Sequence, residues 1–139
     1  MISKIIIGTW PLSGDYGKID YKQIKDVLEY CYELGIKEFD TAPNYGNGVA
    51  EKFLGEIFGS RLDVLINTKI GNLPFNKKSY EIKELKKSFE NSLKILKRDS
   101  INALFLHNPR MEITDYTEIL NFMHELKDKG RINQIGLSK

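Results

Sequence analysis

The sequence predicts an α/β fold in which parallel strands alternate with helices along the chain. Two kinds of segment lead to this prediction. Short apolar runs are typical of buried strands, and longer segments whose apolar residues recur every three or four positions are typical of helices. The two kinds alternate four times along the chain, and a fifth apolar run follows. Strands joined through helices pair in parallel by right-handed crossovers, and the helices then cover the sheet.

The five strands are predicted from runs of apolar and β-branched residues that end at a glycine or a polar side chain. The fourth run is the most apolar part of the chain. In chain order the predicted strands are Lys4 to Thr9, Ile36 to Ala42, Val64 to Ile70, Ile101 to Leu106 and Ile132 to Ser138.

Four helices are predicted between these strands from the helical spacing of apolar residues and from the glycines that end three of the segments. The first opens at Asp20 and places Ile24, Val27, Leu28, Cys31 and Leu34 on one face before Gly35. The second runs from Val49 to Phe58 before Gly59, the third follows the polar Gly71 to Lys78 loop from Ser79 to Leu96, and the fourth spans Asp115 to Lys129 before Gly130.

The composition predicts one folded domain over residues 1–139, without a linker or a low-complexity tract. Of the 139 residues, 41% are hydrophobic and 29% are charged, which excludes a disordered chain. The net charge of +2 is spread over mixed signs, so no nucleic-acid partner is expected. No apolar run approaches the roughly 18 residues of a membrane span, and no signal peptide pattern is present. Together with a single cysteine, Cys31, these features predict a cytoplasmic protein with no membrane partner.

Two α/β architectures begin with this order of elements. An open, doubly wound sheet of five strands would be complete at this length, whereas a (β/α)₈ barrel typically needs about 250 residues. Length therefore favours the open sheet. However, no Gly-x-Gly-x-x-Gly pattern follows the first strand, which makes a dinucleotide site of the open-sheet kind unlikely.

Polar or ionisable residues stand at the carboxyl end of every predicted strand. Parallel α/β proteins bind their ligands at this edge, where the strand ends converge. Taken singly, each residue has an ordinary structural explanation, such as a turn cap, a solvated lysine or a core histidine. Together they predict a site at one rim; the pairs are Thr9-Trp10, Asp40-Thr41, Thr68-Lys69, His107-Asn108 and Ser138-Lys139.

The residue types at this rim suit the reduction of a carbonyl group. Lys69 and Asp40 end neighbouring strands and are expected to pair as ions. Tyr45, in the loop after Asp40, can fold back toward Lys69, whose positive charge favours the phenolate and eases proton transfer. His107 can then polarise the carbonyl. Hydrolase and glycosidase patterns are missing, and the spacing of His107 and His124 fits no metal site, so no metal is expected and His124 is predicted at the surface.

Several motifs resemble those of the aldo-keto reductases. The run from Phe39 to Gly48, continued by Glu51-Lys52-Phe53-Leu54-Gly55, is similar to the family signature, and Asn67-Thr68-Lys69 is similar to its strand-three lysine. The stretches Ser92 to Leu96, Asn102 to Pro109, Lys129 to Ile132 and Ile135 to Ser138 resemble later blocks. The resemblance extends from Gly8 to Ser138.

The resemblance implies a parallel (β/α) barrel of the TIM type, of which this chain forms about the first half, through strand five. It also implies reduction of an aldehyde or ketone, a small carbonyl substrate, with NADPH and without a metal. Tyr45 would be the general acid, Lys69 the residue that eases its ionisation, Asp40 the partner of Lys69, and His107 the group that orients the carbonyl. By the same resemblance, the cofactor-binding residues would be Thr9, Asp40 and Ser138, and Trp10 would line the substrate pocket.

Two departures from the family pattern leave alternatives open. Lys139 stands where the family often has asparagine, and the segments that hold the pyrophosphate and the 2′-phosphate would follow strand five. We therefore expect an incomplete NADPH site and little or no activity from this chain alone. The alternatives are a non-catalytic half-barrel that self-associates through its open strand edges as a homo-oligomer, and a regulatory relative that binds the nucleotide without much turnover. The sequence does not specify which carbonyl compound is reduced.

Overall fold

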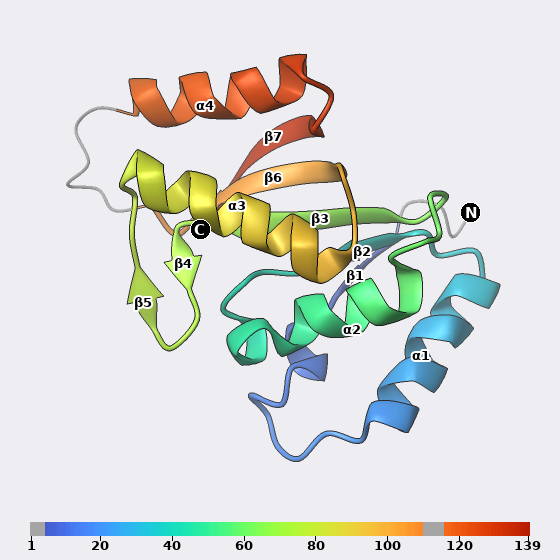
Figure 1. Cartoon of the computed structure of the whole chain (residues 1–139). Helices are drawn as coiled ribbons and strands as arrows, with labels where there is room; N and C mark the ends of the chain where they lie inside the picture. The colour runs from blue at the N-terminus through green and yellow to red at the C-terminus, as the bar shows by residue number, and fades with distance from the viewer. Residues whose placement is uncertain (1–4, 110–115) are drawn as a thin grey trace.

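A computed structural model describes residues 5–109 and 116–139, and its centre is one parallel sheet of five strands (Figure 1). The strand order β1-β2-β3-β6-β7 follows the chain, and every neighbouring pair is parallel. The bounds are Ile6–Gly8 for β1, Glu38–Asp40 for β2, Leu65–Ile70 for β3, Ile101–His107 for β6 and Ile132–Ser138 for β7. All five predicted strands are thereby confirmed, although β1 and β2 are shorter than their apolar runs, and Lys4 lies outside the described residues.

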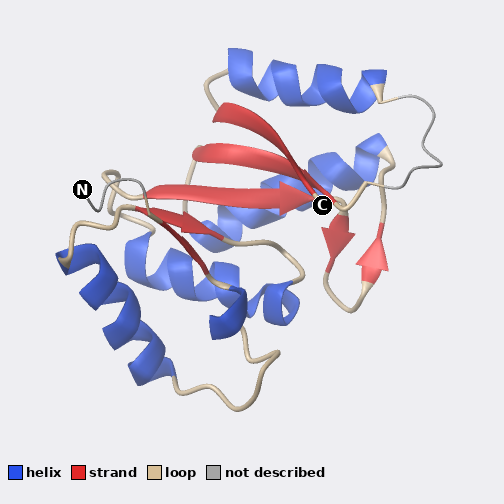
Figure 2. Cartoon of the chain, turned by 180° about the vertical axis from the view of Figure 1, so that it is seen from behind, coloured by secondary structure: helices blue, strands red, loops and turns tan. Residues whose placement is uncertain are grey.

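The four predicted helices are also present, and all lie on the same side of the sheet (Figure 2). They are α1 (Tyr21–Glu33), α2 (Val49–Phe58), α3 (Ile82–Leu96) and α4 (Thr117–Asp128). Asp20 caps α1, because its Oδ1 accepts a hydrogen bond from the backbone N–H of Gln23 at 3.1 Å. The helix α3 begins three residues after the predicted Ser79, and Asp115 lies outside the described residues.

Strand order decides between the two architectures that begin with this order of elements, and it confirms the barrel that the family resemblance implies. A doubly wound sheet reverses its strand order after the first strands and carries helices on both faces. Here each new strand adds to the same edge, and each crossover helix stays on the same face. This is the construction of a barrel wall, so the chain forms part of a TIM-type (β/α) barrel.

The hydrophobic core lies between the sheet and the helices, where large side chains are removed from solvent at about 1.5–3 kcal/mol each. Gly55 allows α2 and α3 to approach closely, because a Cβ there would overlap the backbone carbonyl oxygen of Ile95. The largest fully buried side chains are Phe39, Phe58, Phe89, Leu28, Leu54, Ile66, Ile70, Leu85, Leu96, Leu104, Met123 and Ile132.

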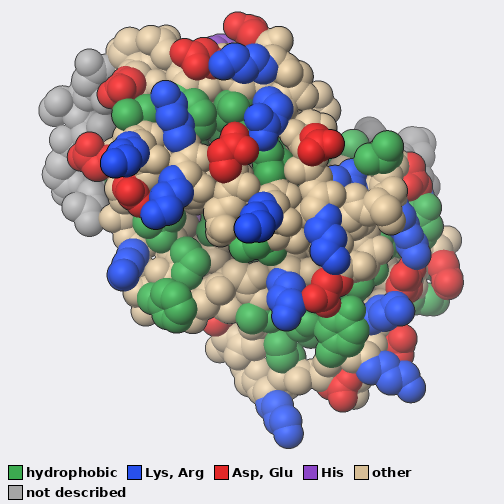
Figure 3. All heavy atoms as spheres, viewed as in Figure 1, with side chains coloured by type: hydrophobic (Ala, Val, Ile, Leu, Met, Phe, Trp, Pro, Cys, Tyr) green, Lys and Arg blue, Asp and Glu red, His purple; other side chains and the backbone are tan. Residues whose placement is uncertain are grey.

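Helix α1 buries less than its periodicity predicts. Val27 and Leu34 remain 48% and 44% exposed, because α1 lies at the β1 edge of the sheet and contacts only α2 among the other helices closely. On the helical face of the molecule, acidic and basic side chains are interspersed (Figure 3). Within residues 5–109 and 116–139, no helix has the length and apolar character needed to cross a bilayer.

One predicted loop is in fact a short hairpin. Between β3 and α3, β4 (Asn72–Leu73) and β5 (Lys77–Lys78) form a two-stranded antiparallel ribbon whose tip residues Phe75 and Asn76 have positive φ. Strands of two residues carry no periodic signal, which explains why the pattern indicated only a loop. The hairpin projects from the carboxyl-terminal edge of the sheet (Figure 1).

Candidate active site

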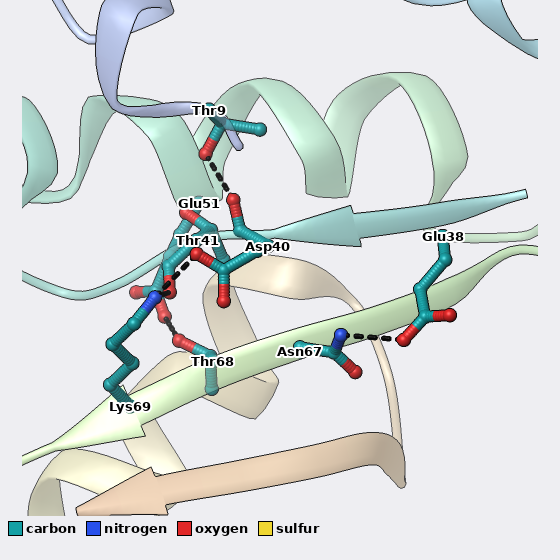
Figure 4. A network of polar contacts seen from close by, with 8 residues as sticks. All are labelled: Thr9, Glu38, Asp40, Thr41, Glu51, Asn67, Thr68 and Lys69. Carbon is teal, nitrogen blue, oxygen red and sulfur yellow. Dashed lines mark hydrogen bonds and ion pairs between the residues drawn. The ribbon is translucent and has the colours of Figure 1, made fainter. Parts of the chain in front are cut away.

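The ionisable ends of neighbouring strands meet at one rim of the sheet, as the sequence predicts. Lys69 Nζ lies 2.5 Å from Asp40 Oδ2 and 2.8 Å from the backbone oxygen of Thr41, to which it donates (Figure 4). The Lys69 residue is only 4% exposed. A buried ammonium needs such partners to remain charged, so this pair places a fixed positive charge beneath the rim.

Tyr45 reaches this charge because the chain turns sharply after it. Gly46, Asn47 and Gly48 all have positive φ, and a Cβ on Gly46 would overlap the backbone oxygen of Ser13. Only glycine can pack this closely in this conformation. The turn brings the centroid of the Tyr45 ring to 4.9 Å from Lys69 Nζ.

Two further rings enclose Tyr45. The Trp10 ring stacks on it with a centroid distance of 6.1 Å, and the His107 ring meets it edge to face, also at 6.1 Å. Ring pairs at this separation prefer offset or edge-on geometry, so both contacts restrain the phenol. Trp10 belongs to the short 3₁₀ helix Trp10–Leu12 that follows β1.

His107 is buried at the end of β6 and is electrically neutral at pH 7. Burial lowers its pKa from 6.5 to about 4, and the positive charges of Lys69 and Lys78 act in the same direction. Its Nδ1 has no hydrogen-bond partner among the described residues. The Tyr80 hydroxyl lies 2.8 Å from the backbone oxygen of His107 and 2.5 Å from that of Asn108, which secures the strand end.

The remaining predicted residues lie on the same rim. Thr9 donates from its backbone N–H and its hydroxyl to the backbone oxygen of Asp40, at 2.9 and 3.0 Å. Ser138 is in register with His107, and its carbonyl accepts from the N–H of Asn108 at 2.7 Å. His124 is exposed on α4, outside this cluster. Among residues 5–109 and 116–139, no group of three or more acidic, histidine or cysteine side chains is arranged to hold a metal.

Asp15 is a site residue that sequence reasoning missed. Its Oδ2 accepts hydrogen bonds from Trp10 Nε1 at 2.8 Å, Ser13 Oγ at 2.9 Å and the N–H of Gly46 at 3.2 Å. Burial acts to raise the pKa of this carboxyl, but the three hydrogen bonds outweigh it and lower the pKa below its ordinary value. Asp15 thereby ties the loop after β1 to the turn that carries Tyr45, and only the neighbouring glycines at 14 and 17 hint at this turn.

Glu51 is a second residue whose place the sequence did not reveal. Thr68 Oγ1 donates to Glu51 Oε1 at 2.6 Å (Figure 4). Successive side chains of a strand point to opposite faces, so Thr68 and Lys69 lie on different faces of β3. The Glu51 residue is fully buried. Burial raises the pKa of this carboxyl, while the hydrogen bond from Thr68 and the charge of Lys69 oppose the rise.

A cavity of about 730 Å³ opens beside Tyr45 at this rim. Its walls come from the loops that follow β1, β2, β3 and β6, and most of the side chains are polar. The lining residues are Trp10, Asp15, Asn44, Tyr45, Asn47, Asn72, Phe75, Asn76, His107 and Asn108.

Known proteins are similar to this chain in both sequence and fold. A model of the Aldo/keto reductase family matches residues 4–139. The chain is 33% identical over 135 residues to a probable voltage-gated potassium channel subunit beta of Arabidopsis thaliana, a match that covers 93% of this chain and 40% of that protein. It is 32% identical over 145 residues to the aldo-keto reductase YhdN of Bacillus subtilis, with coverages of 98% and 43%.

Solved structures agree with this relationship. The holo form of an aldo-keto reductase of Bacillus halodurans matches with a TM-score of 0.85 and 27% identity, over 97% of this chain and 45% of that one. An aldo-keto reductase of Klebsiella pneumoniae in complex with NADPH matches with a TM-score of 0.80 and 25% identity, over 99% and 46%. The chain thus spans about half, or somewhat less, of the length of these relatives. On the family match and the shared fold, the chain belongs to the aldo/keto reductase family.

Proposed function

We propose that the protein reduces the carbonyl group of a small aldehyde or ketone with NADPH, and that this chain supplies the group that donates the proton. One observation carries the proposal. A buried ammonium, held by Asp40, lies under the ring of Tyr45, and the neutral imidazole of His107 meets that ring from the side. This arrangement suits proton donation to an oxygen atom that gains negative charge.

Tyr45 is the proton donor in this proposal, and Lys69 assists it electrostatically. When a phenol gives up its proton, a phenolate remains, and a positive charge within about 5 Å stabilises it. Asp40 and the backbone oxygen of Thr41 keep the ammonium in place at 2.5 and 2.8 Å. Lys69 therefore needs no reorganisation at the moment of proton transfer.

His107 orients the carbonyl and does not supply the proton. With its pKa lowered to about 4, the imidazole holds no acidic proton near neutral pH. A neutral imidazole still has one N–H, which can donate a hydrogen bond to the carbonyl oxygen. Tyr45 and His107 would thus hold the same oxygen from two sides.

The residues at the rim fit the nicotinamide end of NADPH. Asp40 and Ser138 would hold this end, and Thr9 would contribute as an acceptor, because its hydroxyl proton is already donated to the backbone oxygen of Asp40. The structure of the Klebsiella pneumoniae relative with NADPH supports the choice of cofactor. When bound, NADPH supplies the hydride that is added to the carbonyl carbon.

The test combines cofactor binding with a matched variant. Trp10 is the only tryptophan of the chain and lines the cavity, so NADPH should quench its fluorescence saturably. Tyr45→Phe keeps the ring that stacks on Trp10 but removes the hydroxyl. Catalysed reduction of para-nitrobenzaldehyde by NADPH, measured as the rate above the uncatalysed reaction, should fall by about 10²–10⁴ in this variant, with unchanged quenching. A catalysed rate that is equal in both proteins would refute the role of Tyr45, and no quenching at millimolar NADPH would refute the cofactor-binding role of the rim in this chain.

A second candidate function is self-association through the β7 edge. No described strand covers the outer side of β7, and an apolar cavity of about 600 Å³ lies between β7 and α4. Leu137, which lines it, is 64% exposed. Exposed apolar strand edges favour pairing with another chain. Light scattering after size-exclusion chromatography should then show a dimer that Leu137→Lys disrupts; a monomer at all concentrations would exclude this function.

A further inference from the structure

The ring of Tyr80 lies between the ends of the two strands that carry Lys69 and His107. Strand β3 ends directly before Gly71, and His107 is the last residue of β6. A Cβ at Gly71 would lie 2.7 Å from Cε1 of Tyr80 and 3.1 Å from the backbone oxygen of His107. The half-buried ring of Tyr80 therefore packs directly on the backbone of Gly71. The N–H of Ser79 donates to the oxygen of Gly71 at 3.0 Å, which holds the chain before Tyr80 at the same point.

The hydroxyl of Tyr80 meets two successive backbone carbonyls where the chain leaves β6. It lies 2.8 Å from the oxygen of His107 and 2.5 Å from that of Asn108, and its single proton is shared between them. Asn108 has a φ of 46°, in the left-handed region that residues other than glycine seldom adopt. Its N–H donates to the oxygen of Ser138 in β7 at 2.7 Å. The turn after His107 is thus held from β7 and from Tyr80.

The imidazole of His107 depends on this backbone anchor, because few contacts hold the ring itself. Its Nδ1 has no hydrogen-bond partner in the described part of the chain, and the Tyr45 ring meets the imidazole edge to face at 6.1 Å. The ammonium of Lys69, by contrast, is held directly by two oxygen atoms. The direction of the imidazole is therefore set largely by the backbone from which it projects, and Tyr80 binds the carbonyl of that residue.

We propose that Tyr80 is a positioning residue: its hydroxyl, acting through two backbone carbonyls at the end of β6, sets the direction in which the His107 imidazole faces Tyr45. This inference rests on the proposed reductase function, which gives the imidazole its task of orienting a carbonyl group. The described residues that line the cavity do not include Tyr80, so it acts without touching the ligand. A small misplacement of an orienting group is enough to slow the chemical step.

The test uses two matched variants. Tyr80→Phe removes the hydroxyl and keeps the ring that packs on Gly71. The control is Tyr32→Phe, which removes another half-buried phenol hydroxyl, one that donates to Asp63 Oδ2 at 2.8 Å. Asp63 precedes β3, so this hydrogen bond lies at the opposite edge of the sheet from His107. A general effect of losing a bound phenol should appear in both variants, whereas an effect on the imidazole should appear only in Tyr80→Phe.

The first readout uses the chain without cofactor or substrate. Proton NMR follows the imidazole signals of His107 and their nuclear Overhauser cross-peaks to Tyr45, and hydrogen exchange follows the N–H of Asn108. In Tyr80→Phe the cross-peaks should weaken, and the His107 signals should move toward those of the exposed His124. The N–H of Asn108 should exchange about tenfold faster relative to the core N–H groups of β6. The control variant should leave all three readouts unchanged.

The second readout is the catalysed reduction of para-nitrobenzaldehyde by NADPH, measured in a double-mutant cycle with His107→Gln. Tyr80→Phe should lower kcat about tenfold, with unchanged quenching of Trp10 by NADPH. In the His107→Gln background, the same change should have no further effect on kcat, because two residues that act through one group are not additive. The control variant should leave kcat unchanged in both backgrounds.

Unchanged His107 signals and unchanged exchange in Tyr80→Phe would overturn the inference, whatever the rates. The same changes in Tyr32→Phe, or an equal loss of kcat in the His107→Gln background, would overturn it as well. A chain without any catalysed rate would count against the reductase function, and the NMR readouts would then still decide whether Tyr80 orients His107.

Discussion

The neutral state of His107 leads to a prediction that can be measured without cofactor or substrate. The imidazole is buried at the end of β6, and Lys69 and Lys78 add positive charge nearby, so its pKa falls from 6.5 to about 4. The perturbation is a change of pH, combined with the variant His107→Gln. The exposed His124, the only other histidine, provides an internal reference.

The size of the effect follows from linkage between protonation and folding. At about 1.4 kcal/mol for each pH unit, the difference between 6.5 and about 4 corresponds to about 3 kcal/mol. The unfolded chain binds the proton below pH 6.5, whereas the folded chain binds it only below about pH 4. The contribution of His107 to the free energy of unfolding should therefore be highest above pH 6.5, fall by about 3 kcal/mol as the pH drops to about 4, and stay level below that.

The assay is urea unfolding of the original chain and of His107→Gln at several pH values, from below the folded to above the unfolded pKa of His107. Both proteins are prepared without a histidine tag. The difference between the two isolates His107 from the acidic groups, which titrate in both proteins. Proton NMR of the imidazole signals, assigned with His124→Gln, gives the two pKa values directly. A His107 midpoint near 6.5, or a pH-independent difference between the two chains, would refute the reasoning.

Three further predictions use the same urea assay. Gly55→Ala places a methyl group on a backbone carbonyl of α3 and should lower the free energy of unfolding by about 1–3 kcal/mol, whereas Gly8→Ala, with open space around it, should change it by under about 1 kcal/mol. Asp40→Asn leaves the buried ammonium of Lys69 without its carboxylate; because Asp40 is itself 27% exposed, the expected loss is about 2–4 kcal/mol, and a neutral result would count against a charged Lys69. Glu51→Gln replaces the carboxyl by a permanently neutral amide; because burial raises the pKa of Glu51 and favours its neutral form, the original chain should lose stability relative to the variant as pH rises through that pKa, so the two stability curves should diverge toward neutral pH.

The elements of the fold were predictable because their signals are local. The spacing of Ile24 and Leu28, or of Leu85 and Phe89, indicates a helix without knowledge of any other part of the chain, and both pairs are buried. The pairing of Asp40 with Lys69 was predictable for a related reason. Both end strands that are consecutive in the chain, and such strands are usually neighbours in a sheet.

The parts that were missed depend on contacts between distant residues. Asp15 belongs to the site only because the turn at Gly46, thirty-one positions away, returns to it. The burial of Glu51 was not predicted, since it depends on how α2 lies against β3. The order of elements alone fitted both a barrel and an open sheet, and length pointed to the open sheet; only the family resemblance implied the barrel, because strand order is a property of the whole sheet.

The indole of Trp10 donates a hydrogen bond to Asp15 and so belongs to the rim. The fluorescence of Trp10 therefore reports on the rim separately from the rest of the molecule. All tryptophan fluorescence comes from this one half-exposed side chain, whereas circular dichroism reports mainly on the four helices. The loop after β1 rests on few buried contacts, and segments of this kind open with lower free energy than the core. Fluorescence and circular dichroism, recorded in one unfolding experiment, would therefore show whether the rim unfolds together with the helices or before them. A single probe would not separate the two steps.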